Sequence, residues 1–239
     1  MAGRDAPAWP PEDEVPLALP FTGPWRVRNS PARRVPSHGT DLFGTRYAVD
    51  FVGVDARGRD AAHRDWRTAL ATEPPQRFAA FGRPVLAPAA GVVVAVHDGE
   101  VDHGARRSPL TLLAYAATQA GRVRAGTAAV AGNHVVLRLP DGRAHVVLVH
   151  LRRGSVRVVP GQEVVAGQQL GECGNSGNST QPHVHLQVAD GPDPWTARAL
   201  PVVFTGYRER LRGAERVRVR GVPAEDSVVE PLAAGDRGG

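Results

Sequence analysis

Short apolar runs, each closed by a turn that contains glycine, fill the sequence between residues 84 and 188. Apolar runs of this length, bounded by glycine and proline, are typical of β-strands rather than helices. The composition agrees, because 27 Gly and 21 Pro residues accompany only 5% aromatics, which favours many turns over long helices. We therefore predict an all-β fold. The expected strands lie at residues 84–88, 92–96, 132–139, 145–151, 156–161, 164–171 and 183–188.

Two histidines, His183 and His185, lie two positions apart in the last of these runs. Residues i and i+2 of a strand leave the same face of a sheet, about 7 Å apart along the backbone. Such a pair suits either two ligands of one metal ion, or one ligand beside one acid or base. A polar, glycine-rich loop at residues 174–179 precedes the pair, and we expect a functional site where this loop meets the strand.

An aspartate, Asp50, interrupts an apolar strand predicted at residues 46–52. The alternation places Tyr47, Val49 and Phe51 on one face and Asp50 on the other. A carboxylate in such a strand is unfavourable unless it is paired, hydrogen-bonded or bound to a cation. Two explanations follow from the residues, either a cation ligand or an edge-strand aspartate that bonds to a loop.

The charge distribution restricts the classes of partner. The formal net charge is +5, and all 29 basic residues are arginines spread along the chain. An even spread with few aromatics does not favour nucleic-acid binding, whereas a basic surface suits an anionic polymer such as a cell wall. The single cysteine, Cys173, excludes an intrachain disulfide. No apolar stretch is long enough to span a bilayer, and residues 1–20 show no export signal, which by itself predicts a cytoplasmic protein.

The chain divides into three parts by composition. Residues 1–34 are expected to form an irregular lead, in which residues 21–27 could form a first strand or lie over the core. Residues 191–239 are expected to form a C-terminal extension with an edge strand near 201–204 and disorder from residue 233. Between them we predict one domain, residues 35–190. Two polar stretches, at about 54–82 and 97–131, are expected to be insertions with short helices at 65–70 and 110–119.

A series of motifs in this central part resembles a known family. The ordered series is similar to that of the lysostaphin/LytM-type zinc metallopeptidases, the M23 family, over roughly residues 35–190, and the order is far more specific than any single motif. The motifs are Pro-Val-Leu-Ala-Pro-Ala-Ala-Gly at 84–91, Gly-Asn-His-Val at 132–135, His-Leu-Arg-Arg-Gly-Ser at 150–155, Gly-Gln-Glu-Val-Val-Ala-Gly-Gln at 161–168, Gly-Asn-Ser-Gly at 174–177 and Pro-His-Val-His at 182–185.

The resemblance implies both a fold and a reaction. The fold would be antiparallel β-sheets that form a groove, with a core like the lipoyl-domain hybrid motif. The reaction would be hydrolysis of peptide bonds in peptidoglycan through a zinc-bound water. By the resemblance, one zinc ion is held by His38, Asp50 and His185, while His150 and His183 line the reaction site as catalytic residues. Either of these two histidines could be the base, because the chain has no His-Glu-X-X-His motif.

One departure from the family concerns the first two ligands. Its members usually place histidine and aspartate four positions apart, whereas residues 39–49 separate His38 from Asp50. Asp41 lies nearer to His38 and is the alternative ligand. We prefer Asp50 because its surroundings are strand-like, and because the free energy of closing a longer loop rises only slowly with length.

Two alternatives to an enzyme remain at this point. A non-catalytic LytM-like module would bind cell-wall peptide or a protein partner, and such relatives typically lose one or more ligands. A lipoyl-like or sugar-binding β module would not require five polar residues in register. Retention of all five residues favours the peptidase. The cell-wall location implied by the resemblance conflicts with the absence of a visible export signal, so the sequence leaves localisation open.

Overall fold

The computed structural model describes residues 13–61, 68, 70–108, 127–193 and 196–233. Within these residues the protein is almost entirely β-structure, with thirteen strands, one short α-helix and two 3-10 turns. The predicted all-β class is therefore confirmed. The helices expected at 65–70 and 110–119 and the disorder expected from residue 233 fall almost entirely outside the described residues. No helix in the described ranges is long and apolar enough to cross a membrane.

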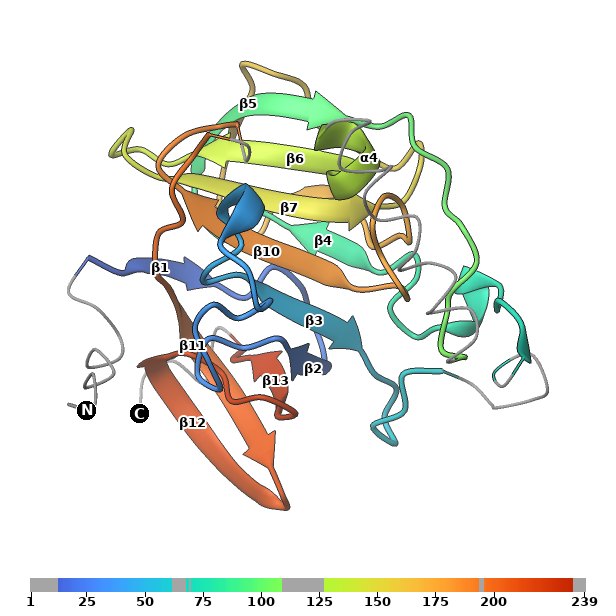
Figure 1. Cartoon of the computed structure of the whole chain (residues 1–239). Coiled ribbons are helices and arrows are strands. Elements are labelled where there is room, and N and C mark those ends of the chain that lie inside the picture. Colours follow the sequence, from blue (N-terminus) through green and yellow to red (C-terminus); the bar gives the residue numbers. More distant parts are fainter. Residues whose placement is uncertain (1–12, 62–67, 69, 109–126, 194–195, 234–239) are drawn as a thin grey trace, which may run out of the picture.

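Eleven strands form one sheet, with the order β1-β11-β13-β2-β3-β10-β7-β6-β5-β8, and β12 pairs with β11 at its side (Figure 1). Every pairing is antiparallel except that of β1 with β11. The N-terminal strands are β1 (Val15–Ala18), β2 (Trp25–Arg28) and β3 (Val49–Gly53). The central ones are β5 (Gly91–His97), β6 (Asn133–Arg138), β7 (His145–Leu151), β8 (Glu163–Val164) and β10 (Val184–Ala189). The last three are β11 (Val202–Leu211), β12 (Ala214–Gly221) and β13 (Val228–Pro231).

The remaining elements are short. Strands β4 (Pro84–Leu86) and β9 (Gln169–Glu172) form a separate two-stranded sheet. The 3-10 turns are η1 (Leu42–Gly44) and η2 (Pro75–Arg77), and the helix is α4 (Thr127–Ala131). In Figure 1, η1 and α4 both lie over the part of the sheet formed by β6, β7 and β10.

The middle of the sheet is buried on both faces. Along β7, Val146 and Leu148 join the main hydrophobic core, whereas Val147 and Val149 belong to a smaller apolar cluster on the other face. This is the period-two alternation of a strand. Because all seven residues of β7 are buried, polar side chains on the second face lie in a low-dielectric setting next to that small cluster.

Both ends of the chain contribute to the same sheet as the central domain. The irregular structure predicted for residues 1–34 is wrong for β1, whose Leu17 is buried in the core. The possible first strand at 21–27 overlaps β2, whose Trp25 is buried there as well. The short edge strand predicted near 201–204 is the start of the ten-residue β11. Strand β12 was not predicted from the sequence. Its Arg and Val residues alternate on an exposed hairpin with β11, so it lacks the apolar run of a buried strand (Figure 1).

The two stretches predicted as insertions are joined to each other. Glu73 of the first and Ala105 of the second form an antiparallel bridge with two backbone hydrogen bonds, of 2.9 and 2.8 Å. The Glu73 carboxylate also accepts two hydrogen bonds of 2.8 Å from the Arg107 guanidinium. Ala61 and Phe78 form a second bridge, and with Ala105 they make a separate small hydrophobic cluster.

Candidate metal centre and active site

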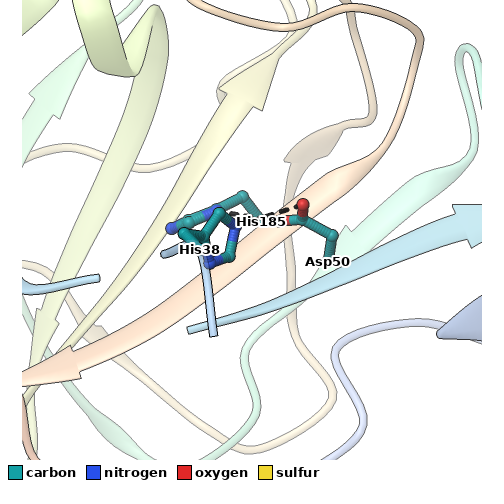
Figure 2. Close-up of side chains that lie close together, drawn as sticks. All are labelled: His38, Asp50 and His185. Atoms are coloured by element: carbon teal, nitrogen blue, oxygen red, sulfur yellow. Dashed lines mark hydrogen bonds and ion pairs between the residues drawn. The ribbon is translucent and has the colours of Figure 1, made fainter. Parts of the chain in front are cut away.

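Three side chains that are far apart in the sequence meet on the second face of the sheet. The potential ligand atoms of His38, Asp50 and His185 all lie within 4.8 Å of one another. Nδ1 of His185 is 2.8 Å from Oδ1 of Asp50, and Nε2 of His38 is 3.2 Å from Oδ2. Figure 2 shows the two imidazoles and the carboxylate converging from two strands and a loop.

The strand pairing places two members of this cluster. Asp50 on β3 is the direct partner of His185 on β10 in the antiparallel register. His38 comes instead from the loop between β2 and β3. That loop is closed at its base, because the Ser37 amide donates to the Arg46 carbonyl at 2.9 Å and the Ser37 hydroxyl donates to the Thr45 carbonyl at 3.1 Å.

Asp41, the alternative acidic ligand, lies outside the cluster. Its carboxylate is exposed and pairs with Arg46 at 2.7 Å. Arg46 itself stands four positions before Asp50, where the family spacing predicts a histidine. The structure therefore brings His38 to Asp50 from twelve positions upstream, by way of the loop.

Asp50 is held as an anion. Burial alone would raise the pKa of this carboxyl, but the neighbouring charges of His38 and His183 and the hydrogen bonds from His185 and His38 outweigh burial and hold the pKa well below its usual range. The amide of Asn29 adds a further hydrogen bond to Oδ2 at 2.7 Å. A buried carboxylate with this many donors around it is charged throughout the physiological pH range.

Hydrogen-bond partners define the tautomers of the two histidines in the cluster. The Ser37 hydroxyl uses its proton on the Thr45 carbonyl, so it accepts from Nδ1–H of His38 at 3.0 Å. The side-chain oxygen of Gln187 lies 3.0 Å from Nε2 of His185 and accepts from it. Each ring thus turns its other nitrogen toward Asp50.

This donor set fits a zinc ion. Two imidazole lone pairs and one carboxylate, gathered in a buried place, repel one another unless a cation or protons lie between them. Catalytic zinc sites use three protein ligands of this kind and keep a fourth position open. The three residues that the resemblance implies as ligands are therefore chemically suited to the metal.

His150 and His183 lie beside the cluster. Their ring centroids are 4.8 Å apart, and that of His150 is 6.0 Å from that of His185. His150 donates Nδ1–H to the Ser176 carbonyl at 2.9 Å, and His183 donates Nδ1–H to the Gln181 carbonyl at 2.8 Å. In both rings Nε2 is therefore the nitrogen not used by these carbonyls, and that of His183 lies 3.6 Å from Oδ1 of Asp50.

The protonation of His150 is controlled by its surroundings. Burial is the main cause that lowers the pKa of this imidazole well below its ordinary value, and the charges of His183 and His185 lower it further. The neutral form, which can accept a proton, is therefore the resting form near neutral pH. The backbone of His150 is in the left-handed region, with φ of 64°, which is unusual for a residue other than glycine.

All five residues line one groove with a volume of about 410 Å³. One wall is apolar and built of small side chains, among them Val147, Val149 and Ala131. Most of the other lining residues are polar. The polar lining consists of Asn29, Thr40, Thr45, Asn178, Thr180 and Gln187 together with the His and Asp side chains.

Two polar residues of the site, Asn29 and Gln187, were not expected from the sequence. The place of Gln187 could have been inferred from the sequence, because it lies two positions after His185 and must share its face of the strand. The place of Asn29 could not have been inferred, since it lies in the predicted irregular lead, at a left-handed backbone position with φ of 51°. Only the pairing of β2 with β3 brings it next to Asp50.

An all-β sheet whose groove holds a buried carboxylate and four histidines defines a site suited to metal-dependent hydrolysis. The family model described as Peptidase family M23 matches residues 113–196 of this chain, which include His150, His183 and His185. The match confirms the M23 resemblance over this segment, which is about a third of the chain. His38 and Asp50 lie outside that segment.

Three solved structures illustrate the structural similarities. The catalytic domain of the antimicrobial peptidase lysostaphin from Staphylococcus simulans is 22% identical, with 64% of this chain and 74% of that chain covered and a TM-score of 0.36. The catalytic domain of the prophage-encoded M23 protein EnpA from Enterococcus faecalis is 23% identical, with 60% and 81% covered and a TM-score of 0.34. Helicobacter pylori Csd3 is 17% identical, with 76% of this chain but only 33% of Csd3 covered and a TM-score of 0.36.

Proposed function

We propose that this protein is a zinc metalloendopeptidase that hydrolyses peptide bonds in peptidoglycan peptides or cross-bridges. The observation that supports it most strongly is the convergence of His38, Asp50 and His185 with their metal-binding atoms turned toward one another. The peptidoglycan substrate is the one that the M23 resemblance implies. The net charge of +5 is in keeping with an anionic polymer as the partner.

In this proposal His38 through Nε2, His185 through Nδ1 and the Asp50 carboxylate hold the zinc ion. When bound there, zinc would polarise the scissile carbonyl and lower the pKa of water. The hydrogen bonds of Ser37, Asn29 and Gln187 to the far sides of these ligands keep the ligand atoms aimed.

His150 and His183 handle the proton. As water attacks the carbonyl carbon, a new C–O bond forms and an imidazole Nε2 accepts the proton of the water. The same proton then passes to the departing amine as the C–N bond breaks. His150 suits the role of base because burial keeps it neutral, and His183 lies close enough to stabilise the developing oxyanion.

The groove suits an extended peptide. Val147 and Val149, which lie on the second face of β7, form an apolar floor together with Ala131 at the end of α4. The polar side chains of Asn178 and Thr180, on the loop before β10, face the same groove. This arrangement supplies an apolar surface on one side of a substrate backbone and hydrogen-bonding groups on the other.

The experiment incubates the purified protein with peptidoglycan and with glycine-containing peptides, with and without a chelator, and measures zinc content beside peptide release. We expect about one zinc per chain in the wild type, loss of zinc and cleavage in His185→Ala, and zinc retention with at least about a hundredfold loss of turnover in His150→Ala and His183→Ala. The matched control is His97→Ala, a histidine that does not line the groove.

Two results would contradict the proposal in different ways. A wild-type protein without zinc above background would remove the metallopeptidase. A wild-type protein that holds zinc and binds peptidoglycan, but releases no peptide from any substrate, would indicate the non-catalytic binding module instead.

A further inference from the structure

We propose that Gln187 is a positioning residue that selects which nitrogen of His185 is free to bind the metal, and that the backbone carbonyl of Phe43 sets the orientation of its amide. This inference rests on the proposed function, because it concerns the same metal site. It assigns a role to a residue that touches neither the expected reacting groups nor the ion. Gln187 follows His185 by two positions on β10 and is 4% exposed.

The first step is the orientation of the amide. The nitrogen Nε2 of Gln187 lies 2.7 Å from the carbonyl oxygen of Phe43. A carbonyl oxygen can only accept a hydrogen bond, so the group that faces it must be the NH₂ of the amide. The oxygen Oε1 of Gln187 must then face the opposite way, toward His185.

The second step is the tautomer of His185. Oε1 of Gln187 lies 3.0 Å from Nε2 of His185, and an amide oxygen can only accept. Nε2 must therefore carry a proton, so Nδ1 is the nitrogen that is left to bind a metal ion in place of its own proton. That is the nitrogen that lies 2.8 Å from the Asp50 carboxylate. An Nε2 without a proton would place its lone pair against that of the Gln187 oxygen, between side chains that are more than nine-tenths buried.

His185 is unlike the other three histidines of the groove in this respect. His38, His150 and His183 each bond through Nδ1 to a hydroxyl or a backbone carbonyl, so Nε2 is the nitrogen left for a metal ion or a substrate. Only a side chain that accepts from Nε2 reverses this choice at His185. Gln187 supplies that acceptor, so it determines that this ring differs from its neighbours.

The third step is the connection to His38. Phe43 has a left-handed backbone, with φ of 60° and ψ of 25°, and Gly44 after it has φ of 69°. A Cβ atom on Gly44 would lie 3.0 Å from Nε2 of Gln187, so the loop and the amide are in close contact. The same loop carries His38. One amide therefore both orients His185 and ties the His38 loop to β10.

The experiment compares wild type with Gln187→Leu, which keeps the size of the side chain but offers no acceptor, and Gln187→Glu, which keeps an acceptor for Nε2–H. Long-range ¹H–¹⁵N spectra at about pH 8, on metal-free and zinc-loaded protein, report which histidine nitrogens carry protons. Competition with a chelator gives the dissociation constant for zinc. The control is Gln169→Leu, which removes a strand amide on β9 that lies away from the groove.

We expect wild-type His185 to be protonated at Nε2 in both states. Gln187→Leu should weaken zinc binding about 10- to 100-fold and give a mixture of His185 tautomers, while Gln187→Glu should keep the Nε2–H form and most of the zinc affinity. Gln169→Leu should change neither. The wild-type spectrum needs no variant, so the inference can be tested even if Gln187→Leu does not fold.

Two outcomes would overturn the inference. Wild-type His185 could carry its proton on Nδ1 in the zinc-loaded protein, or Gln187→Leu could keep both the tautomer and the zinc affinity of the wild type. A wild-type protein with the Nε2–H tautomer that binds no zinc would refute the proposed function and leave the orienting role of Gln187 standing.

Discussion

Asp50 and His185 are direct partners across the antiparallel pair β3–β10, and the carboxylate oxygen Oδ1 lies 2.8 Å from imidazole Nδ1. The backbone hydrogen bonds of two core strands thus determine the distance between two of the three candidate ligands. His38 is the third and comes from a loop. The cluster is therefore rigid on one side and depends on the closure of one loop on the other.

The assignment of the acidic ligand predicts different outcomes for two similar substitutions. Asp50→Asn removes the charge that the cluster is built around, so zinc content should fall to background and peptide cleavage should drop by at least about a hundredfold. Asp41→Asn removes an exposed partner of Arg46 and should leave both unchanged, with a stability change within about 0.5 kcal/mol. Zinc analysis and a cleavage assay on both variants decide the matter. Loss of zinc in Asp41→Asn alone would contradict the assignment.

The parts of the site that could be predicted from the sequence are those governed by strand periodicity. His183 and His185 share a face because they are two residues apart, and Asp50 stood out because it is a charge in an apolar strand. The position of His38 could not be derived in this way. It lies twelve positions before Asp50 and reaches it by a folded loop, and the conformation of a loop does not follow a simple sequence period.

The fold shows the same division. Most of the central strands, with apolar runs and glycine turns, could be predicted because local pattern and buried position agree. The strand predicted at 156–161 is wrong, because these residues form no strand. Strand β1 could not be predicted, because it is four residues long and pairs with β11 far along the chain, whereas the possible strand at 21–27 overlaps β2. Strand β12 carries mostly exposed side chains, so it lacks the apolar signal that identifies a buried strand.

The contact between Gly132 and Gly177 predicts a matched pair of alanine variants. Both Gly177 and Gly142 have left-handed backbones, with φ of 66° and 69°. A Cβ on Gly177 would lie 2.3 Å from the amide nitrogen of Gly132, whereas nothing lies within 4 Å of one on Gly142. Gly142→Ala should therefore cost only the backbone strain, about 1 kcal/mol, and leave activity intact.

Gly177→Ala should cost more, at least about 2 to 3 kcal/mol, because the backbone must also move. The movement would disturb the neighbouring Ser176 carbonyl, which accepts the hydrogen bond from His150, so turnover should fall as well. Urea denaturation and a cleavage assay measure the two effects. Equal stability losses in the two variants would show that the close contact has no energetic consequence.

The ion pair between Glu73 and Arg107 predicts that the two inserted stretches stabilise each other. The Glu73 side chain is fully buried and receives two guanidinium hydrogen bonds of 2.8 Å. Glu73→Ala leaves Arg107 without this partner and should lower the free energy of unfolding by about 3 kcal/mol. Glu163→Ala, which replaces an exposed side chain on β8, should change it by less than about 0.5 kcal/mol. Denaturant unfolding of both variants makes the comparison, and similar values would contradict a stabilising role for the pair.

His134 lies outside the candidate metal site, and its burial predicts how the free energy of unfolding depends on pH. Its pKa is lowered mainly by burial and to a smaller degree by the charge of His97, against a raising effect of the hydrogen bond to the Gly132 carbonyl. Its ring stacks on that of His97 with centroids 5.7 Å apart. Below about pH 6.5 the unfolded chain takes up a proton at this residue, and the folded protein does so only at lower pH. The contribution of neutral His134 is therefore complete above about pH 6.5 and is lost as the pH falls toward the folded-state value.

His134→Gln removes the titrating group and should flatten this part of the pH profile. The difference in unfolding free energy between wild type and His134→Gln should shift in favour of the variant as the pH falls from about 7 to about 5. Urea titrations across that range measure it, with Arg143→Gln as the control, because an exposed guanidinium does not titrate there. A difference that is independent of pH would mean that His134 has the same pKa in the folded and unfolded states. The acid sensitivity of the fold would then have to come from other buried groups, of which Asp50 and His150 are the two with the strongest depression.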